Sequence, residues 1–147
     1  MSKEQNIQAQ IQWGDAVNSG NLEALRALAA PSVIEHDPAP AQGPGPQGYI
    51  DMFAEMRSAF PDLKVTGEHL VADEDSVALA YTVTGTHQGD FQGIPATGKT
   101  IQARGVQIAR FVDGKMVERW GSSDELGILK QLGVAPKQGL LAKLGVG

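Results

Sequence analysis

The sequence predicts an α+β domain in which N-terminal helices wrap a cone-shaped, curved antiparallel sheet. Apolar residues recur at helical spacing as far as Phe60. From Leu63 onward they alternate with polar residues, as they do in strands, and turn sequences separate the alternating runs. Helices followed by hairpin-connected strands are typical of a sheet with helices packed on one face. Such a fold encloses an interior that suits a small apolar ligand.

Three helices are predicted in the first 60 residues. The first spans residues 3–18 and stops at the Asn-Ser-Gly sequence that ends there. We expect Asn21 to cap a second helix over residues 22–30, which the next proline ends. A strand over residues 32–37 and a stiff loop rich in proline and glycine lead into a third helix over residues 47–60.

Four strands and a closing helix are predicted in the remainder of the chain. The strands lie within residues 63–71, 77–83, 101–111 and 116–120. Asp113-Gly114 is a strong signal for the hairpin turn between the last two. The helix is expected over residues 125–132, so we predict a single domain over 1–133. A docking helix, a lid and disorder all stay open for the tail at 134–147.

Composition excludes several classes of function. The formal net charge is −5 and the 12 lysines and arginines are scattered, which argues against binding to nucleic acid or to an anionic membrane. There is no apolar run of about 18 residues and no signal-peptide pattern, so we expect a cytoplasmic protein. The absence of cysteine excludes disulfides, thiolate metal sites and a cysteine nucleophile.

The histidines and serines do not follow familiar catalytic patterns. His36, His69 and His87 are not at the spacing of a metal-binding motif, so no metal site is expected. A G-x-S-x-G sequence is also missing, which argues against a Ser-His-Asp hydrolase. Acid/base chemistry is therefore left to carboxylates and histidines.

Several short stretches together resemble the SnoaL-like polyketide cyclase family, within the nuclear-transport-factor-two-like superfamily. The stretches are FPDL at 60–63, TGTHQGDFQGIPATGK at 84–99, RFVDGK at 110–115, ERW at 118–120 followed by Asp124, and QLG at 131–133. The resemblance implies a cone-shaped α+β barrel with a deep pocket, usually in a homodimer. It also implies a cofactor-independent intramolecular aldol cyclisation, in which an aspartate at the end of the last strand is the acid/base.

Asp124 is the candidate for that aspartate. Strand alternation places Trp120 and Asp124 on one face, so we expect both in the pocket, where desolvation beside an indole would favour proton transfer. The other interpretation is that Asp124 caps the closing helix. The residues alone favour the cap, and the resemblance favours the acid/base.

His36 and His87 are the candidate assisting groups. His36 ends the first strand, where it is expected to lean into the pocket mouth, although it would equally stabilise the turn before Pro38. His87 ends the second long strand beside a Gly-rich lid or rim loop, and the alternative is a rim residue bonded to the backbone.

The substrate-binding candidates depend on which strand face lines the pocket. If one row of the third long strand faces inward, Gln107 orients a substrate carbonyl; if the other row does, Arg104 binds an oxyanion or carboxylate. The remaining expected substrate-binding residues are Trp120, Phe53, Tyr49 and Phe91.

The leading functional hypothesis is a cofactor-independent cyclase, or a related lyase or isomerase, acting on a small and largely apolar carbonyl compound. The first alternative is a non-catalytic carrier or sensor that binds a ligand in the same pocket. The second is a structural dimerisation module, because this fold hosts many unrelated functions and the site must decide between them.

Overall fold

The computed structural model describes residues 2–134, in which four α-helices and one 3₁₀ helix accompany five strands. In chain order they are α1 (Lys3–Ser19), η1 (Leu22–Ala24), α2 (Leu25–Leu28), β1 (Ala29–Glu35), α3 (Gly45–Ala59), β2 (Lys64–Ala72), β3 (Ser76–Thr86), β4 (Thr100–Val112), β5 (Lys115–Ser123) and α4 (Glu125–Gln131). Nearly all of the expected tail, residues 135–147, lies outside the described residues.

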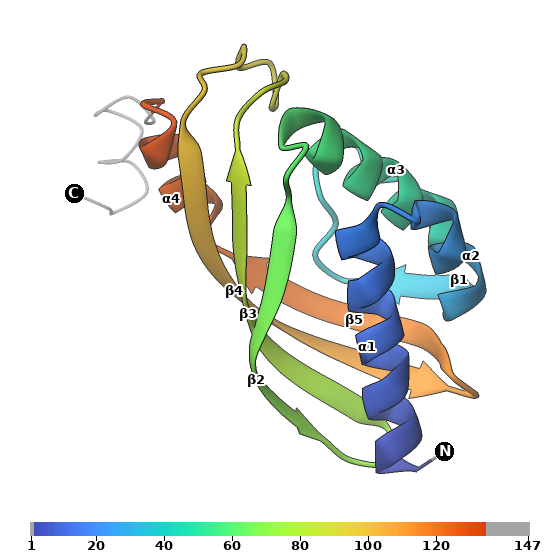
Figure 1. Ribbon diagram of the computed structural model, residues 1–147. Coiled ribbons are helices and arrows are strands. Elements are labelled where there is room, and N and C mark those ends of the chain that lie inside the picture. The colour runs from blue at the N-terminus through green and yellow to red at the C-terminus, as the bar shows by residue number, and fades with distance from the viewer. Residues whose placement is uncertain (1, 135–147) are drawn as a thin grey trace, which may run out of the picture.

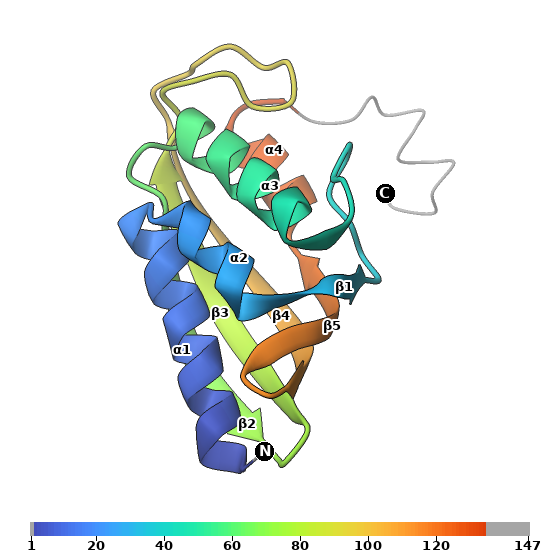
Figure 2. The same ribbon diagram turned by 90° about the vertical axis from the view of Figure 1, so that its right-hand side faces the viewer.

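The strands form one curved sheet in the order β1-β5-β4-β3-β2. Helices α1, α2 and α3 lie on its concave side, and α4 packs beside β4 (Figures 1 and 2). The predicted α+β class is confirmed. One pairing differs from a purely antiparallel sheet, because β1 runs parallel to β5.

Local signals explain most helix boundaries. Ser2 and Gln5 form a reciprocal capping box at the start of α1, and Gly20 ends it in the left-handed conformation with a φ of 78°. The predicted second helix is shorter than expected, since a 3₁₀ turn precedes a single α-helical turn and Ala29 already belongs to β1. The expected cap is wrong, because the Asn21 side chain makes no capping hydrogen bond.

Alternation along β4 shows which face of the sheet is covered. The buried residues are Ala103, Gly105, Gln107, Ala109 and Phe111, and every residue between them is exposed. The buried row faces the helices. The row that contains Gln107 is therefore the inner one, and the row that contains Arg104 lies on the outer face.

An extra residue in β5 reverses its alternation. Phe111 pairs with Met116, but the neighbouring Arg110 pairs with Glu118, so Val117 is a bulge. Beyond it, Arg119 faces the concave side and Trp120 the outer side. Counting by twos from Met116 therefore assigns the wrong face to Trp120, and this corrects the expectation that Trp120 lines the pocket.

Asn18 links the end of α1 to the edge strand β2. Its amide Nδ2 donates to the carbonyl oxygen of Val65 at 2.9 Å, and its Oδ1 accepts from the Val65 amide at 2.8 Å. The side chain thus supplies the two hydrogen bonds that a neighbouring strand would make. It fixes α1 on the sheet and satisfies part of an otherwise open edge.

Replacing Asn18 with alanine should lower the free energy of unfolding by about 2 kcal/mol, because two backbone groups lose their partner. Urea denaturation measures the loss. Asn21→Ala is the matched control, since that amide makes no cap bond. Equal losses in the two variants would contradict the proposed role of Asn18.

Candidate functional site

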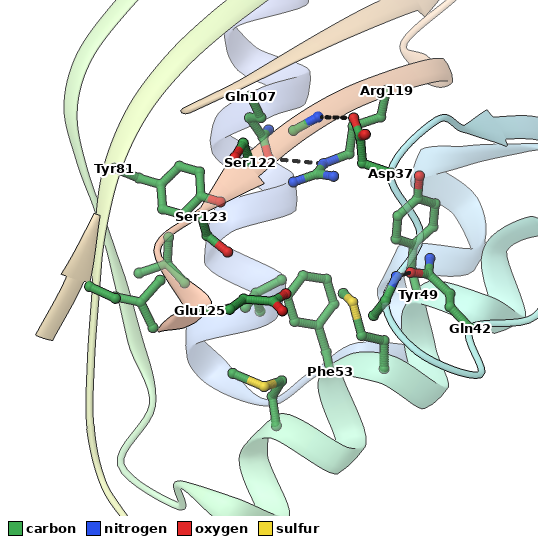
Figure 3. Close-up of a pocket in the computed structure, with 18 of the residues that line it drawn as sticks. Asp37, Gln42, Tyr49, Phe53, Tyr81, Gln107, Arg119, Ser122, Ser123 and Glu125 are labelled. Carbon is green, nitrogen blue, oxygen red and sulfur yellow. Dashed lines mark hydrogen bonds between the residues drawn. The ribbon is translucent and has the colours of Figure 1, made fainter. Parts of the chain in front are cut away.

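A cavity of about 630 Å³ lies between the concave face of the sheet and helices α1 and α3. Figure 3 shows side chains from α3, the loop after β1 and the end of β5 converging on it. Most of the wall is apolar: Met52, Phe53 and Met56 come from α3, and Leu63, Val65, Leu79, Val83, Ala103 and Ile128 complete it. Such a wall favours a largely hydrocarbon ligand.

One wall of the cavity carries a chain of polar side chains. Arg119 donates from Nε to Gln107 Oε1 at 3.1 Å and from Nη1 to Glu35 Oε1 at 2.7 Å. Gln107 in turn donates to Gln10 Oε1 at 3.3 Å, and the Tyr49 hydroxyl donates to Glu35 Oε1 at 3.2 Å. The Arg119 and Glu35 side chains are only 18% and 10% exposed. This is a largely desolvated ion pair held by neutral hydrogen-bonding groups.

Two tyrosines in this wall remain protonated well above neutral pH. Burial, reinforced by the Glu35 carboxylate, raises the pKa of Tyr49. Burial also raises the pKa of Tyr81, an effect that the Arg119 guanidinium partly opposes. Both hydroxyls can therefore donate hydrogen bonds.

Carboxylates gather near the mouth of the cavity. Asp37, Asp124 and Glu125 all line it and are exposed. Asp37 Oδ2 accepts from the Gly121 amide at 2.9 Å, which ties the loop after β1 to β5 (Figure 3). The rim is therefore acidic, and the one arginine of the wall is already paired with Glu35.

Asp124 lies at the cavity and caps a helix, but the expected desolvation beside the Trp120 indole is wrong, because Asp124 is exposed and Trp120 lies on the outer face. Its Oδ1 accepts the Gly127 amide at 2.9 Å, so it caps α4. It also lines the cavity. Its second oxygen, Oδ2, accepts no hydrogen bond from the described residues. The cap fixes the position of a carboxylate that keeps one oxygen for a ligand.

His36 lies on the outer face of the sheet. Its ring stacks on Trp120 with centroids 4.6 Å apart, and Nε2 lies 2.7 Å from Glu118 Oε2. Glu118 also accepts from Arg110 at 3.1 Å. Neither His36 nor Trp120 lines the cavity. Val33 and Glu35 form the inward row of β1, which corrects the expected pocket-facing orientation of His36.

His87 is fully buried but does not line the cavity. Its Nδ1 accepts the Thr97 amide at 3.2 Å and lies 2.9 Å from the Thr97 hydroxyl, while its ring packs on Phe60. These contacts join the two ends of the loop between β3 and β4. The structure thus places His87 at the base of this loop, as in the backbone-bonded alternative.

The other sequence-predicted residues divide between the two faces. Gln107, Phe53, Tyr49 and Phe91 line the cavity, and Arg104 does not. Phe91 reaches it from the loop between β3 and β4, where it packs on Phe60.

Sequence reasoning missed Arg119, Glu35, Gln10 and Tyr81, which all contribute to the polar wall. A count by twos along β5 places Arg119 on the outer face, because such a count does not detect the bulge. Tyr81 stands in an apolar row of β3, which is typical of core residues. Gln10 and Glu35 could have been found from the sequence, because each is a polar residue in a mainly apolar row. Gln10 lies in such a row of α1, and Glu35 shares its row with Val33.

Two structural findings bear on other classes of site. Within residues 2–134, no three His, Asp or Glu side chains gather closely enough to hold a metal ion. No helix in this range is both long and apolar enough to cross a membrane.

Comparisons with known proteins agree on one family. Residues 7–132 match the family model of the SnoaL-like polyketide cyclases. The chain is 27% identical over 126 residues to the aklanonic acid methyl ester cyclase DauD of Streptomyces sp. (strain C5), over 81% of this chain and 76% of that relative. It is 28% identical over 104 residues to a nogalonic acid methyl ester cyclase of Streptomyces nogalater, over 70% and 75% of the two chains. The structure of IdmH from Streptomyces antibioticus has a TM-score of 0.76 and 34% identity, over 88% and 99%.

Replacing Glu35 with glutamine should destabilise the protein by about 3 kcal/mol, because it leaves the Arg119 charge unpaired in a desolvated wall. The matched control is Glu118→Gln on the outer face, whose partners are more exposed and where a much smaller loss is expected. Thermal and urea unfolding compare the two. A larger loss for Glu118→Gln would contradict this assignment.

Proposed function

The chain belongs to the SnoaL-like polyketide cyclase family, and from this premise we propose that it is a cofactor-independent cyclase. The proposed reaction is an intramolecular aldol-type closure, or a related lyase or isomerase step, on a small and largely apolar carbonyl compound. The observation that carries the proposal is the cavity itself, in which apolar walls meet the carboxylate of Asp124.

In the proposed mechanism Asp124 is both base and acid. Its free oxygen takes a proton from a carbon next to a carbonyl group, and the electrons of that C–H bond move onto the carbonyl oxygen. The resulting enolate carbon attacks a second carbonyl carbon of the same molecule and forms the new C–C bond. The alkoxide left on that second carbonyl takes the proton back from Asp124. Atoms and electrons balance without a co-reactant.

The cavity supports this reaction by confining the substrate. Met52, Phe53 and Met56 offer adaptable apolar contacts, and Phe91 closes part of the wall from the loop between β3 and β4. A folded substrate pose brings the two reacting carbons together, which is the main requirement of an intramolecular closure. Gln107 and the ring of Tyr49 form part of the wall against which the substrate is oriented.

The charges of the residues that line the cavity favour an uncharged substrate. Four carboxylates line the cavity, those of Glu35, Asp37, Asp124 and Glu125, against the single guanidinium of Arg119. An additional free carboxylate would meet net repulsion. An ester avoids this, which agrees with the name of DauD as a cyclase for a methyl ester.

A non-catalytic ligand-binding protein is the alternative function. Its support is the cap made by Asp124, which gives that carboxylate a structural use without any chemistry. The two functions differ in one respect: only the cyclase requires the carboxylate to exchange a proton.

The proposed assembly is a homodimer formed through the outer face of the sheet. Of eight exposed large apolar side chains in the described part of the chain, six lie on this face: Ile34, Val71, Val106, Ile108, Val112 and Trp120. The charged groups beside Trp120, namely Glu118, Arg110 and His36, are already paired within the chain. A second copy of the same face therefore meets an apolar surface without unpaired like charges there.

The Asp124→Asn variant should lose about 10²- to 10⁴-fold in kcat, because asparagine keeps the capping oxygen but cannot exchange a proton. The assay follows ring closure of aklanonic and nogalonic acid methyl esters by chromatography. Asp37→Asn is the matched control at the same rim and should retain most activity. Full activity of Asp124→Asn would refute its role, and tight binding without turnover in the unsubstituted protein would favour the ligand-binding alternative.

The Ile108→Lys variant should shift the protein from dimer to monomer in sedimentation velocity, because it places a charge at the centre of the apolar face. Ile11→Lys is the control, since Ile11 on α1 is 45% exposed, nearly the same as the 44% of Ile108. A monomeric unsubstituted protein, or dissociation by Ile11→Lys alone, would overturn the proposed interface.

A further inference from the structure

Two glycines on the concave face make room for polar side chains. A Cβ at Gly105 would collide with the Tyr81 ring and lie 2.5 Å from its hydroxyl oxygen. A Cβ at Gly121 would lie 2.6 Å and 2.7 Å from the Nη2 and Nη1 atoms of Arg119. Neither glycine has a positive φ, so the backbone does not demand glycine at these positions. What each provides is space, which lets the phenol and the guanidinium lie flat against the sheet.

The register of the sheet brings these two side chains together. Tyr81 pairs with Gly105 across β3 and β4, Gly105 pairs with Ser123, and Gln107 pairs with Gly121 across β4 and β5. The Tyr81 hydroxyl consequently lies near both the Arg119 guanidinium and the Ser123 side chain, which both lower its pKa against the larger effect of burial. Figure 3 shows the phenol and the guanidinium on the same wall.

Both groups keep a donor for a ligand. Arg119 has five N–H donors, of which one goes to Gln107, one to Glu35 and one to the Tyr81 oxygen, so two remain. The Tyr81 oxygen accepts from Arg119 and Ser123, and its own O–H remains available as a donor. Because both residues line the cavity, the free donors are accessible to its contents. Two convergent donors in a desolvated wall match the requirement of a site for developing negative charge on oxygen.

We propose that Tyr81 and Arg119 form an oxyanion site that binds the substrate carbonyl oxygen and stabilises the enolate formed during ring closure. This assignment rests on the proposed function for its substrate and adds the groups that receive the negative charge. Electrons leave the C–H bond when Asp124 takes the proton, and they accumulate on the oxygen held by these two donors.

The surrounding residues suit this role. Glu35 balances the Arg119 charge, so the negative charge that the site stabilises is the one that develops on a bound oxygen during the reaction. Gln107 is a positioning residue, because it holds Arg119 Nε and is itself held by Gln10. The guanidinium is therefore fixed on two sides before any ligand arrives.

The test uses 4-nitrophenol as the probe, since its absorption distinguishes phenol from phenolate. Tyr81→Phe removes one hydroxyl and leaves the ring over Gly105. This variant should bind the phenolate about 10-fold more weakly and leave binding of the neutral phenol nearly unchanged, as expected for a hydrogen bond to a charged acceptor. Tyr49→Phe is the matched control, because that hydroxyl donates to Glu35, and it should leave both affinities unchanged.

A second variant tests the geometry without removing a polar group. Gly121→Ala displaces the Arg119 guanidinium and should also weaken phenolate binding, with folding checked by thermal unfolding. Unchanged phenolate binding in both Tyr81→Phe and folded Gly121→Ala would overturn the oxyanion site. Equal weakening of phenol and phenolate by Tyr81→Phe would do the same. Asp124→Asn should leave the phenolate preference intact, so failure of the cyclase proposal is separable from failure of this one.

Discussion

The bulge at Val117 is the constraint on which the cavity depends. Without this extra residue, the side chains beyond it would exchange faces, and Trp120 would enter the cavity in place of Arg119. The cavity would then lose its guanidinium, and the Glu35 carboxylate would lose its partner. One inserted residue thus decides whether the interior can hold this ion pair.

The same inversion also explains how the short strand β1 stays attached. β1 pairs with β5 at only a few positions, and its register shifts between Ala29 and Ile34. Two side-chain contacts reinforce that weak edge, one on each face of the sheet: Glu35 with Arg119 inside, and His36 with Glu118 outside. The last residue of β1 and the residue after it therefore contact two consecutive residues of β5. The Glu35–Arg119 pair thus both forms part of the polar wall and attaches β1 to the sheet.

The sequence contained enough information for the fold class and for most elements, because helical and strand periodicities are local. Alternation also identified the two possible faces of β4, and burial then selected the row with Gln107. Alternation assigned the wrong face to Trp120, because a bulge exchanges the faces of all later side chains in the strand and leaves the amino-acid composition of the strand unchanged. Alternation did not predict the Glu35–Arg119 pair, because the two residues lie far apart in sequence. They meet because β1 pairs in parallel with β5, and a parallel pairing has no hairpin turn that would identify it in the sequence. For His36, alternation separated the faces but gave no means of choosing between them.

The cap made by Asp124 bears on how such proteins can diverge. An aspartate that holds the first turn of α4 can change to asparagine by exchanging one oxygen for an amide nitrogen, and the helix keeps its acceptor. Because the helix stays equally well capped, selection for stability alone does not preserve the aspartate. With Asp124 as the proposed acid/base, a lineage can lose its chemistry and retain its cavity in a single step, so within a family of this kind enzymes and binding proteins can be neighbours in sequence.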